Sequence, residues 1–202
     1  MSPATKLVIR PIEPDSAADV AELCAQREAC GWGLPGVPGY MQAVKRGDML
    51  YYLLYLSDGV TEHGPIGSGG LDLSGASEPT LASRERAEFC IMGLCLLPEY
   101  RSKGFSRRIA RYLINYGFER LNQKTCGVMT MLQNPLTNHM FPNFGFVEFH
   151  RQPEPEWIVE GAWSVSYRLT RNVWQQYLKS LDAAVLENDA MTVELRKAAV
   201  GE

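Results

Sequence analysis

The chain has 202 residues and a formal net charge of −3, with 46% hydrophobic and 21% charged residues. This length and composition are typical of one globular domain with a full hydrophobic core. The slightly acidic balance gives no support for a protein that binds nucleic acid or a membrane surface, because both need a broad excess of positive charge.

Targeting segments and metal sites are not indicated either. No apolar run approaches the roughly 18 residues of a membrane span, and the N-terminus lacks the apolar stretch of a signal peptide. The five cysteines show neither a Cys-x-x-Cys pair nor zinc-site spacing. We therefore expect reduced core thiols, a cytoplasmic protein and no metal.

The first half of the chain predicts strands and two helices. The expected strands are Lys6–Arg10, Met49–Leu56 and Ile66–Leu73. One helix is expected to end near Ala29, and a second, short helix to span Tyr40–Lys45. Asp15 or Ser16 could cap the first helix. The Asp58-Gly59 turn joins the second and third strands as a hairpin. A polar loop is expected at residues 74–87.

The second half alternates strands with helices. The expected strands are Phe89–Leu97, Gly127–Leu132, Phe146–His150 and Ala162–Leu169, and the expected helices are Phe105–Leu121 and Leu136–Asn143. Thr170 could cap a long C-terminal helix that runs to about Asp189, with an apolar stripe reaching Val185. This order indicates an α+β, or mixed α/β, fold around one sheet.

One domain is expected over residues 1–175, with residues 176–202 as a helical extension of the same domain. The long C-terminal helix could pack on its own domain or on a second copy of the chain, in a homodimer.

The most informative stretch is the basic turn Pro98-Glu99-Tyr100-Arg101-Ser102-Lys103-Gly104-Phe105-Ser106, between a strand and a helix. The first N–H groups of a helix have no partner within it, and the helix dipole favours an anion there. Gly104 permits close approach, and basic side chains surround the turn. The spacing matches neither a Walker loop nor Gly-x-Gly-x-x-Gly, so the turn predicts a pyrophosphate ligand other than ATP or NAD in their usual cradles.

Three segments carry a family resemblance. Residues 101–106 resemble the Arg/Gln-x-x-Gly-x-Gly/Ala turn of the GNAT (Gcn5-related) N-acetyltransferases, which holds the pyrophosphate of acetyl-CoA, with Ser106 where Gly or Ala is usual. Residues 134–146 resemble the family's Asn-x-x-Ala/Ser-x-x-Phe-Tyr-x-x-x-Gly-Phe block. Residues 163–174 resemble its final strand and Leu-Thr-Arg-x-x-Trp ending. The resemblance covers residues 6–175.

The resemblance implies a mostly antiparallel central sheet with helices on both faces. In it, the strands at 88–97 and 126–132 are parallel and splayed at one end. It also implies acetyl-CoA as the cofactor, with pantetheine bound to unpaired backbone groups of one splayed strand. The expected cofactor-binding residues are Leu94, Leu96, Arg101, Ser102, Lys103, Gly104, Phe105, Ser106, Arg107, Asn134, Thr137 and Phe141.

Acetyl transfer to an amine needs a held thioester, a neutral amine, an oxyanion donor and a proton for the leaving thiolate. The expected catalytic residues are Glu88, Leu96 and Asn134. The resemblance makes the Leu96 N–H the oxyanion donor. Glu88 shares strand parity with Leu96 and is the candidate base, while a solvated carboxylate is the alternative. Asn134 could instead cap the helix after it.

The sequence does not offer an evident general acid that would protonate the leaving thiolate. The family often has a tyrosine where this chain has Phe141. A CoA thiol has a pKa near that of cysteine, so we expect the thiolate to leave without a dedicated acid or to take a proton from water.

Three aromatic residues, Trp32, Tyr40 and Trp163, could line an acceptor pocket or could be ordinary core or lid packing. The sequence predicts an acetyl-CoA-dependent N-acetyltransferase that works by direct attack in a ternary complex on a primary amine of a small molecule. Neither nucleic acid nor a membrane is an expected partner. A protein N-terminus or lysine is an alternative acceptor, and an acyl-CoA-binding module without catalysis is the alternative from another class.

Overall fold

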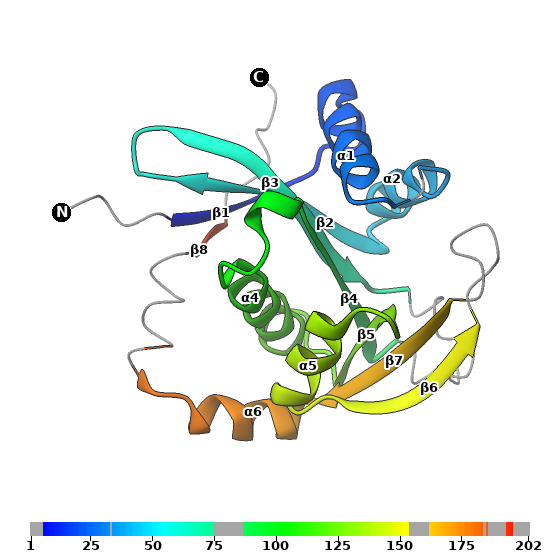
Figure 1. Ribbon diagram of the computed structural model, residues 1–202, viewed down its shortest axis with the longest axis vertical. Helices are drawn as coiled ribbons and strands as arrows, with labels where there is room; N and C mark the ends of the chain where they lie inside the picture. The colour runs from blue at the N-terminus through cyan, green and yellow to red at the C-terminus, as the bar shows by residue number, and fades with distance from the viewer. Residues whose placement is uncertain are drawn as a thin grey trace. The chain divides into compact units, whose positions relative to one another are not determined.

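The computed structural model describes residues 6–32, 34–74, 87–153, 162–183, 185 and 193–195. The chain forms two compact units, one made of residues 1–71, 94–112 and 183–202 and the other of residues 72–93 and 113–182. Strand β4 (Phe89–Leu96) and helix α4 (Phe105–Glu119), both labelled in Figure 1, each begin in one unit and end in the other. The boundary between the units therefore falls within β4 and within α4.

The first unit is built on a sheet. Its strands are β1 (Lys6–Pro11), β2 (Met49–Ser57), β3 (Glu62–Asp72), β8 (Val193–Leu195) and the end of β4, hydrogen-bonded in the order β4-β3-β2-β1-β8. β1 and β2 are antiparallel from Lys6↔Ser57 to Pro11↔Tyr52, whereas β1 and β8 are parallel. The sequence patterns did not predict β8.

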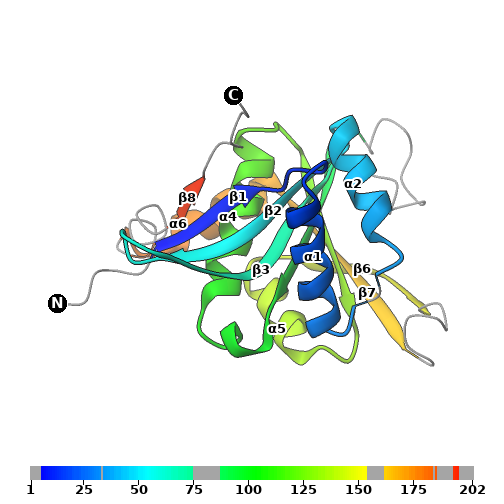
Figure 2. The same cartoon turned by 90° about the horizontal axis from the view of Figure 1, so that it is seen from above.

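Helices α1 (Ala17–Ala29) and α2 (Val37–Arg46) pack beside the strands of this unit (Figure 2). Their apolar faces form a buried cluster with the sheet, made of Ile12, Leu23, Val37, Met41 and Leu53. The Ser16 hydroxyl accepts a hydrogen bond from the Asp19 N–H, so Ser16 is the N-cap of α1 as expected. Helix α2 begins earlier than the expected Tyr40, because Pro38 suits the first turn of a helix.

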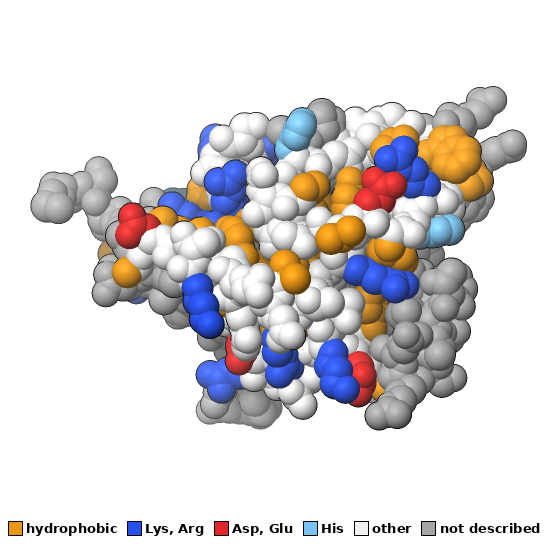
Figure 3. All heavy atoms as spheres, turned by 90° about the horizontal axis from the view of Figure 1, so that it is seen from below, with side chains coloured by type: hydrophobic (Ala, Val, Ile, Leu, Met, Phe, Trp, Pro, Cys, Tyr) orange, Lys and Arg blue, Asp and Glu red, His pale blue; other side chains and the backbone are white. Residues whose placement is uncertain are grey.

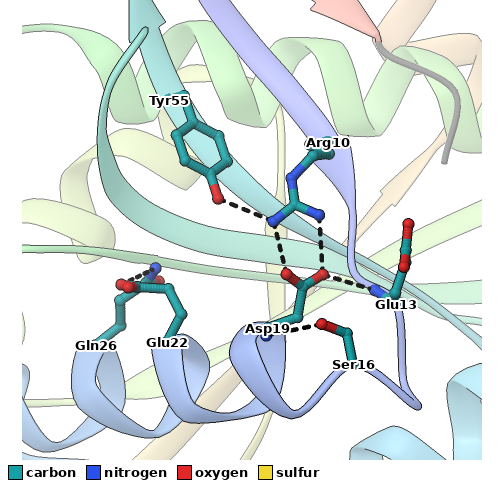
Figure 4. Close-up of polar contacts among 7 residues, drawn as sticks. All are labelled: Arg10, Glu13, Ser16, Asp19, Glu22, Gln26 and Tyr55. Atoms are coloured by element: carbon teal, nitrogen blue, oxygen red, sulfur yellow. Dashed lines mark hydrogen bonds and ion pairs between the residues drawn. The ribbon is translucent and has the colours of Figure 1, made fainter. Parts of the chain in front are cut away.

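A partly buried ion pair joins β1 to α1 (Figure 4). The Arg10 guanidinium donates to both carboxylate oxygens of Asp19, at 2.9 and 2.8 Å, and to the Tyr55 hydroxyl at 3.0 Å. The Glu13 N–H also donates to Asp19, at 2.9 Å. Burial acts to raise the pKa of Asp19, but the hydrogen bonds and charge of Arg10, together with the Glu13 N–H, lower this pKa below its ordinary value.

This network predicts an acid-sensitive contribution to stability. Because the pKa of Asp19 is lower in the folded state, the contribution is present above the unfolded-state pKa of about 3.9 and is lost as pH falls through the folded-state pKa. We expect Asp19→Asn to lower the free energy of unfolding by about 1–3 kcal/mol at pH 7. Urea unfolding at pH 7 and pH 3 measures this loss, which should be smaller at pH 3.

Asp48→Asn is the matched control, because Asp48 forms an exposed ion pair with Arg46. Such a pair contributes no more than about 1 kcal/mol. An equal loss for Asp19→Asn at both pH values would show that the carboxylate charge is not the source of the stability.

The second unit contains β5 (Thr125–Met131), β6 (Val147–Pro153), β7 (Trp163–Thr170) and the start of β4, hydrogen-bonded in the order β6-β7-β5-β4. β7 is antiparallel to both β5 and β6. β4 and β5 are parallel, with a register that runs from Phe89↔Thr125 to Met92↔Val128. Both strands continue past this register, to Leu96 and Met131. The expected parallel pair is therefore confirmed.

The second unit contains α5 (Pro135–Asn143), α6 (Arg171–Ser180) and the end of α4. Trp174 of α6 is fully buried and packs against Phe144 and Tyr177.

The C-terminal helix is shorter than the sequence pattern predicts. Thr170 occupies the N-cap position of α6 as expected, but its side chain makes no capping hydrogen bond. The helix ends at Ser180 because Leu181 is extended, with φ −80° and ψ 145°. The expected stripe up to Val185 therefore does not continue on α6.

Other expected segments fall outside the described residues, among them most of the 74–87 loop and most of the tail after residue 185. Within the part of the chain that is described, no helix is long and apolar enough to cross a membrane.

Candidate functional site

The basic turn lies in the first unit, between the end of β4 and the start of α4. A short 3-10 helix (Pro98–Tyr100) follows the strand. Ser102 and Gly104 then adopt left-handed conformations, with φ 60° and 82°, before α4 begins at Phe105. A Cβ atom built on Gly104 would meet no atom within 4 Å. The backbone of the turn is therefore open to a ligand at the point where the first N–H groups of α4 lack helical partners.

The side chains of this turn divide into two groups. Arg101 Nε donates to the Leu96 carbonyl at 2.9 Å, so this cation folds back onto the end of β4. Lys103 and Arg107 are exposed, and Lys103 Nζ lies 5.5 Å from the centre of the Tyr100 ring. The first turn of α4 contains no acidic residue. An anion at the turn would thus meet positive charge and unpaired N–H groups.

Figure 3 shows the charged side chains on one face of the molecule. On the face drawn in Figure 3, the described Lys and Arg side chains are scattered among apolar and neutral atoms rather than gathered in one patch. That face therefore offers no continuous basic patch to an extended polyanion.

The end of β4 is held firmly within the first unit. The Leu96 carbonyl accepts from Arg101 and also from the Cys30 thiol, at 3.3 Å. The Leu97 N–H donates to the Ile66 carbonyl at 3.0 Å. On the neighbouring strand, a Cβ atom on Gly67 would lie 2.3 Å from the Cys95 carbonyl oxygen, so β3 and β4 approach closely. Leu94 is half-buried and Leu96 is buried on this fixed strand end.

Two of the predicted acceptor residues also belong to the first unit. Tyr40 stacks on Tyr51, with ring centres 6.0 Å apart and an interplanar angle of 13°. Trp32 is 41% exposed, and its backbone N–H donates to the Arg27 carbonyl. The third, Trp163, lies in the second unit at the start of β7 and is 46% exposed.

The remaining predicted cofactor residues lie in the second unit and hold α5 in place. The Asn134 side chain accepts from the Thr137 N–H, which confirms the helix-cap alternative for this residue. The Thr137 hydroxyl shares a hydrogen bond with that of Thr130, at 2.8 Å. The Phe141 ring is buried and packs against Phe146 and Tyr167.

Glu88 directly precedes β4 in the second unit. Its carboxylate accepts from Lys124 Nζ at 2.7 Å, and its carbonyl accepts from the N–H groups of Lys124 and Thr125. The side chain is 37% exposed. This geometry matches the predicted alternative of a solvated carboxylate, with Lys124 as its partner.

The buried cysteines lack the character of nucleophiles. Cys90 and Cys126 are fully buried and lie opposite each other on β4 and β5. The hydrogen bond with Cys90, together with burial, raises the pKa of Cys126. Among the described residues, no group of three or more His, Cys, Asp or Glu side chains could hold a metal ion.

Sequence reasoning missed two polar residues that the structure brings beside predicted ones. Tyr167 packs on Phe141, its hydroxyl donates to Asn138 at 3.2 Å, and burial raises its pKa. The guanidinium of Arg27 lies over the Tyr40 ring, 5.1 Å from its centre. The i,i+3 spacing of Arg27 and Cys30 places them on one face of α1, but nothing in the sequence indicates what that face meets.

Comparisons with known proteins agree with this arrangement at the level of the fold. A mutant form of the spermidine/spermine N-acetyltransferase SpeG from Vibrio cholerae has a TM-score of 0.64 and 16% identity, over 86% of this chain and 97% of that one. A probable acetyltransferase has a TM-score of 0.60 and 20% identity, over 84% and 95% of the two chains. The chain has the fold of the GNAT N-acetyltransferases.

A third similar structure is the dodecameric spermidine N-acetyltransferase of Vibrio cholerae, with a TM-score of 0.62 and 16% identity, over 87% of this chain and 99% of that one. No protein-family model and no curated protein sequence matches the chain. At such identities the likeness establishes the GNAT fold, and the acceptor has to be inferred from the residues of this chain.

Proposed function

We propose that the chain is an acetyl-CoA-dependent N-acetyltransferase that acts on a primary amine of a small molecule by direct attack in a ternary complex. The observation that carries this proposal is the open left-handed turn at Gly104, which leads directly from the end of β4 into α4. On a GNAT fold this turn is where a pyrophosphate would bind. The SpeG structures, which the chain resembles, are acetyltransferases of small amines.

In this proposal the turn at 101–106 and the first turn of α4 bind the pyrophosphate. Lys103 and Arg107 supply charge, and Ser106 and the backbone at Phe105 supply hydrogen-bond donors. Leu94 and Leu96 supply backbone groups for pantetheine, and the Leu96 N–H is the oxyanion donor. Arg101 has a positioning role, since its side chain fixes the Leu96 carbonyl. Asn134, Thr137 and Phe141 lie in the second unit, and their roles stay predictions from the family resemblance.

Two protons have to be accounted for, the one that the amine loses and the one that the leaving thiolate gains. Glu88, in the second unit, stays the candidate base predicted from the sequence, and its carboxylate accepts a hydrogen bond from Lys124. The thiolate of CoA leaves without a dedicated acid, because its pKa is close to that of cysteine.

The test is amine-dependent turnover of acetyl-CoA, followed by mass spectrometry of the acetylated product. This readout avoids thiol reagents, which would also react with the protein's own cysteines. We expect turnover with small primary amines. Turnover with only a lysine peptide or only an N-terminal peptide would support a protein acetyltransferase. Binding of acetyl-CoA without turnover of any amine would support a non-catalytic acyl-CoA-binding module.

A further inference from the structure

Two cysteines of the first unit meet at the end of β4. Cys30 is the C-cap residue of α1, Cys95 is the penultimate residue of β4, and both are free thiols in half-buried positions. The Cys30 thiol donates to the Leu96 carbonyl at 3.3 Å, and the side chain of Cys95 hydrogen-bonds with Cys30. The two sulfur atoms are therefore neighbours, and each residue is still partly accessible to solvent.

The backbone beside this pair is held firmly on the strand side. The Leu97 N–H donates to the Ile66 carbonyl at 3.0 Å, and a Cβ atom on Gly67 would lie 2.3 Å from the Cys95 carbonyl oxygen. On the helix side, Cys30 ends α1 and is followed by Gly31 with φ 74°. A disulfide brings two sulfur atoms to about 2.05 Å, so rotation of the side chains and adjustment at the end of α1 have to supply this approach.

The surroundings favour thiol exchange in a defined order. Burial, followed by the hydrogen bond and the charge of Cys30, raises the pKa of Cys95 to about 12, although Arg101 and Arg27 act to lower it. Cys30 is therefore the thiol that reacts first. Once Cys30 is bound in a mixed disulfide, it no longer holds the proton on Cys95, while the two arginines still favour the thiolate.

A second pair of cysteines provides a contrast within the same chain. Cys90 and Cys126 lie opposite each other on β4 and β5 in the second unit, and both are fully buried. They are also in contact, since a hydrogen bond with Cys90 raises the pKa of Cys126. Thiol exchange needs a reagent to reach a sulfur atom, so this pair should stay reduced where Cys30 reacts.

We propose that Cys30 and Cys95 form a reversible disulfide by exchange with a small-molecule disulfide such as oxidised glutathione. The Cys30 thiolate forms a bond to one glutathione sulfur, the glutathione S–S bond breaks, and one glutathione leaves as the thiolate. The Cys95 thiolate then forms a bond to the Cys30 sulfur and releases the second glutathione. Two protein thiols are oxidised, the glutathione disulfide is reduced, and the two cysteine protons end on the glutathione thiols. The new bond joins α1 to the strand end at which acetyl-CoA is proposed to bind.

The experiment exposes the folded protein to oxidised glutathione, alkylates the remaining thiols in denaturant and maps the peptides by mass spectrometry. We expect two fewer alkylated cysteines than the five in the sequence, with Cys30 linked to Cys95 and with Cys90 and Cys126 alkylated. The oxidised protein should melt roughly 5–15 °C above the reduced protein, because a cross-link between distant segments constrains the unfolded chain. Dithiothreitol should reverse both changes.

Cys24→Ser is the matched control, because Cys24 is another half-buried cysteine of α1. This variant should keep the cross-link and the increase in melting temperature, whereas Cys30→Ser and Cys95→Ser should lose both. Alkylation of all five cysteines in the treated wild type would overturn the inference. Glutathione retained on Cys30 as a stable mixed disulfide, or a Cys30–Cys95 bond that leaves the melting temperature unchanged, would also overturn it. None of these results bears on the proposed function, which turnover of acetyl-CoA tests.

Discussion

Gly104→Asp is expected to abolish the stabilisation of this protein by acetyl-CoA. The variant places a carboxylate in the open space beside the turn, where the pyrophosphate is proposed to bind. It also forces a side chain into a left-handed conformation at φ 82°, at a cost of about 1–2 kcal/mol. Acetyl-CoA at 100 times its dissociation constant should raise the melting temperature of the wild type by roughly 5–10 °C. Thermal unfolding with and without acetyl-CoA measures both effects.

The control for this prediction is Gly47→Asp. Gly47 caps α2 with φ 78°, and a Cβ atom there also meets nothing within 4 Å. The backbone cost should therefore be similar, while the acetyl-CoA response should stay at the wild-type value. CoA should behave like acetyl-CoA, and ATP and NAD should give smaller shifts. A full acetyl-CoA response in Gly104→Asp would mean that the turn is only the start of a helix.

Gly67→Ala is expected to destabilise the protein by about 1–3 kcal/mol, and to weaken acetyl-CoA binding. The new methyl group would lie 2.3 Å from the Cys95 carbonyl oxygen and 3.0 Å from the Leu96 Cα. Both are backbone atoms, so relief requires β4 to move away from β3. That movement would displace the strand end that Arg101 and Cys30 fix. Urea unfolding measures the first effect, and titration with acetyl-CoA the second.

Gly39→Ala is the comparison for this variant. Gly39 lies in α2, and a Cβ atom there contacts nothing within 4 Å. Alanine is the better helix former, so this variant should be as stable as the wild type or more stable by up to about 1 kcal/mol. If Gly67→Ala were as stable as Gly39→Ala and bound acetyl-CoA normally, the close approach of β3 and β4 would have no role in the site.

Local features of the structure were accessible from the sequence. Ser16 and Asn134 act as helix caps because a cap is formed with N–H groups only three residues away. The turn before Phe105 is a strand-to-helix connection because glycine, proline and the apolar periodicity on each side define it within a short window. The parallel pair at β4 and β5 followed from the family resemblance and not from composition.

The exact ends of helices, and short strands, were harder to predict from the sequence. The start of α2 depends on Pro38, which suits a first turn, and the pattern of apolar residues placed the start later. The end of α6 at Ser180 depends on an extended Leu181, although the apolar spacing continues beyond it. A short strand such as β8 (Val193–Leu195) carries too few residues to show a period.

The sequence by itself determined the order of strands and helices as far as α6, the basic turn and the resemblance to the GNAT family. Only the tertiary structure decided which side chains meet: Arg10 with Asp19 and Tyr55, Cys30 with Leu96, and Arg27 with Tyr40. The physical reason is the separation along the sequence of the residues that interact. Caps and turns form between residues a few positions apart, whereas these contacts join segments 9 to 66 positions apart, which the packing of helices on strands brings together.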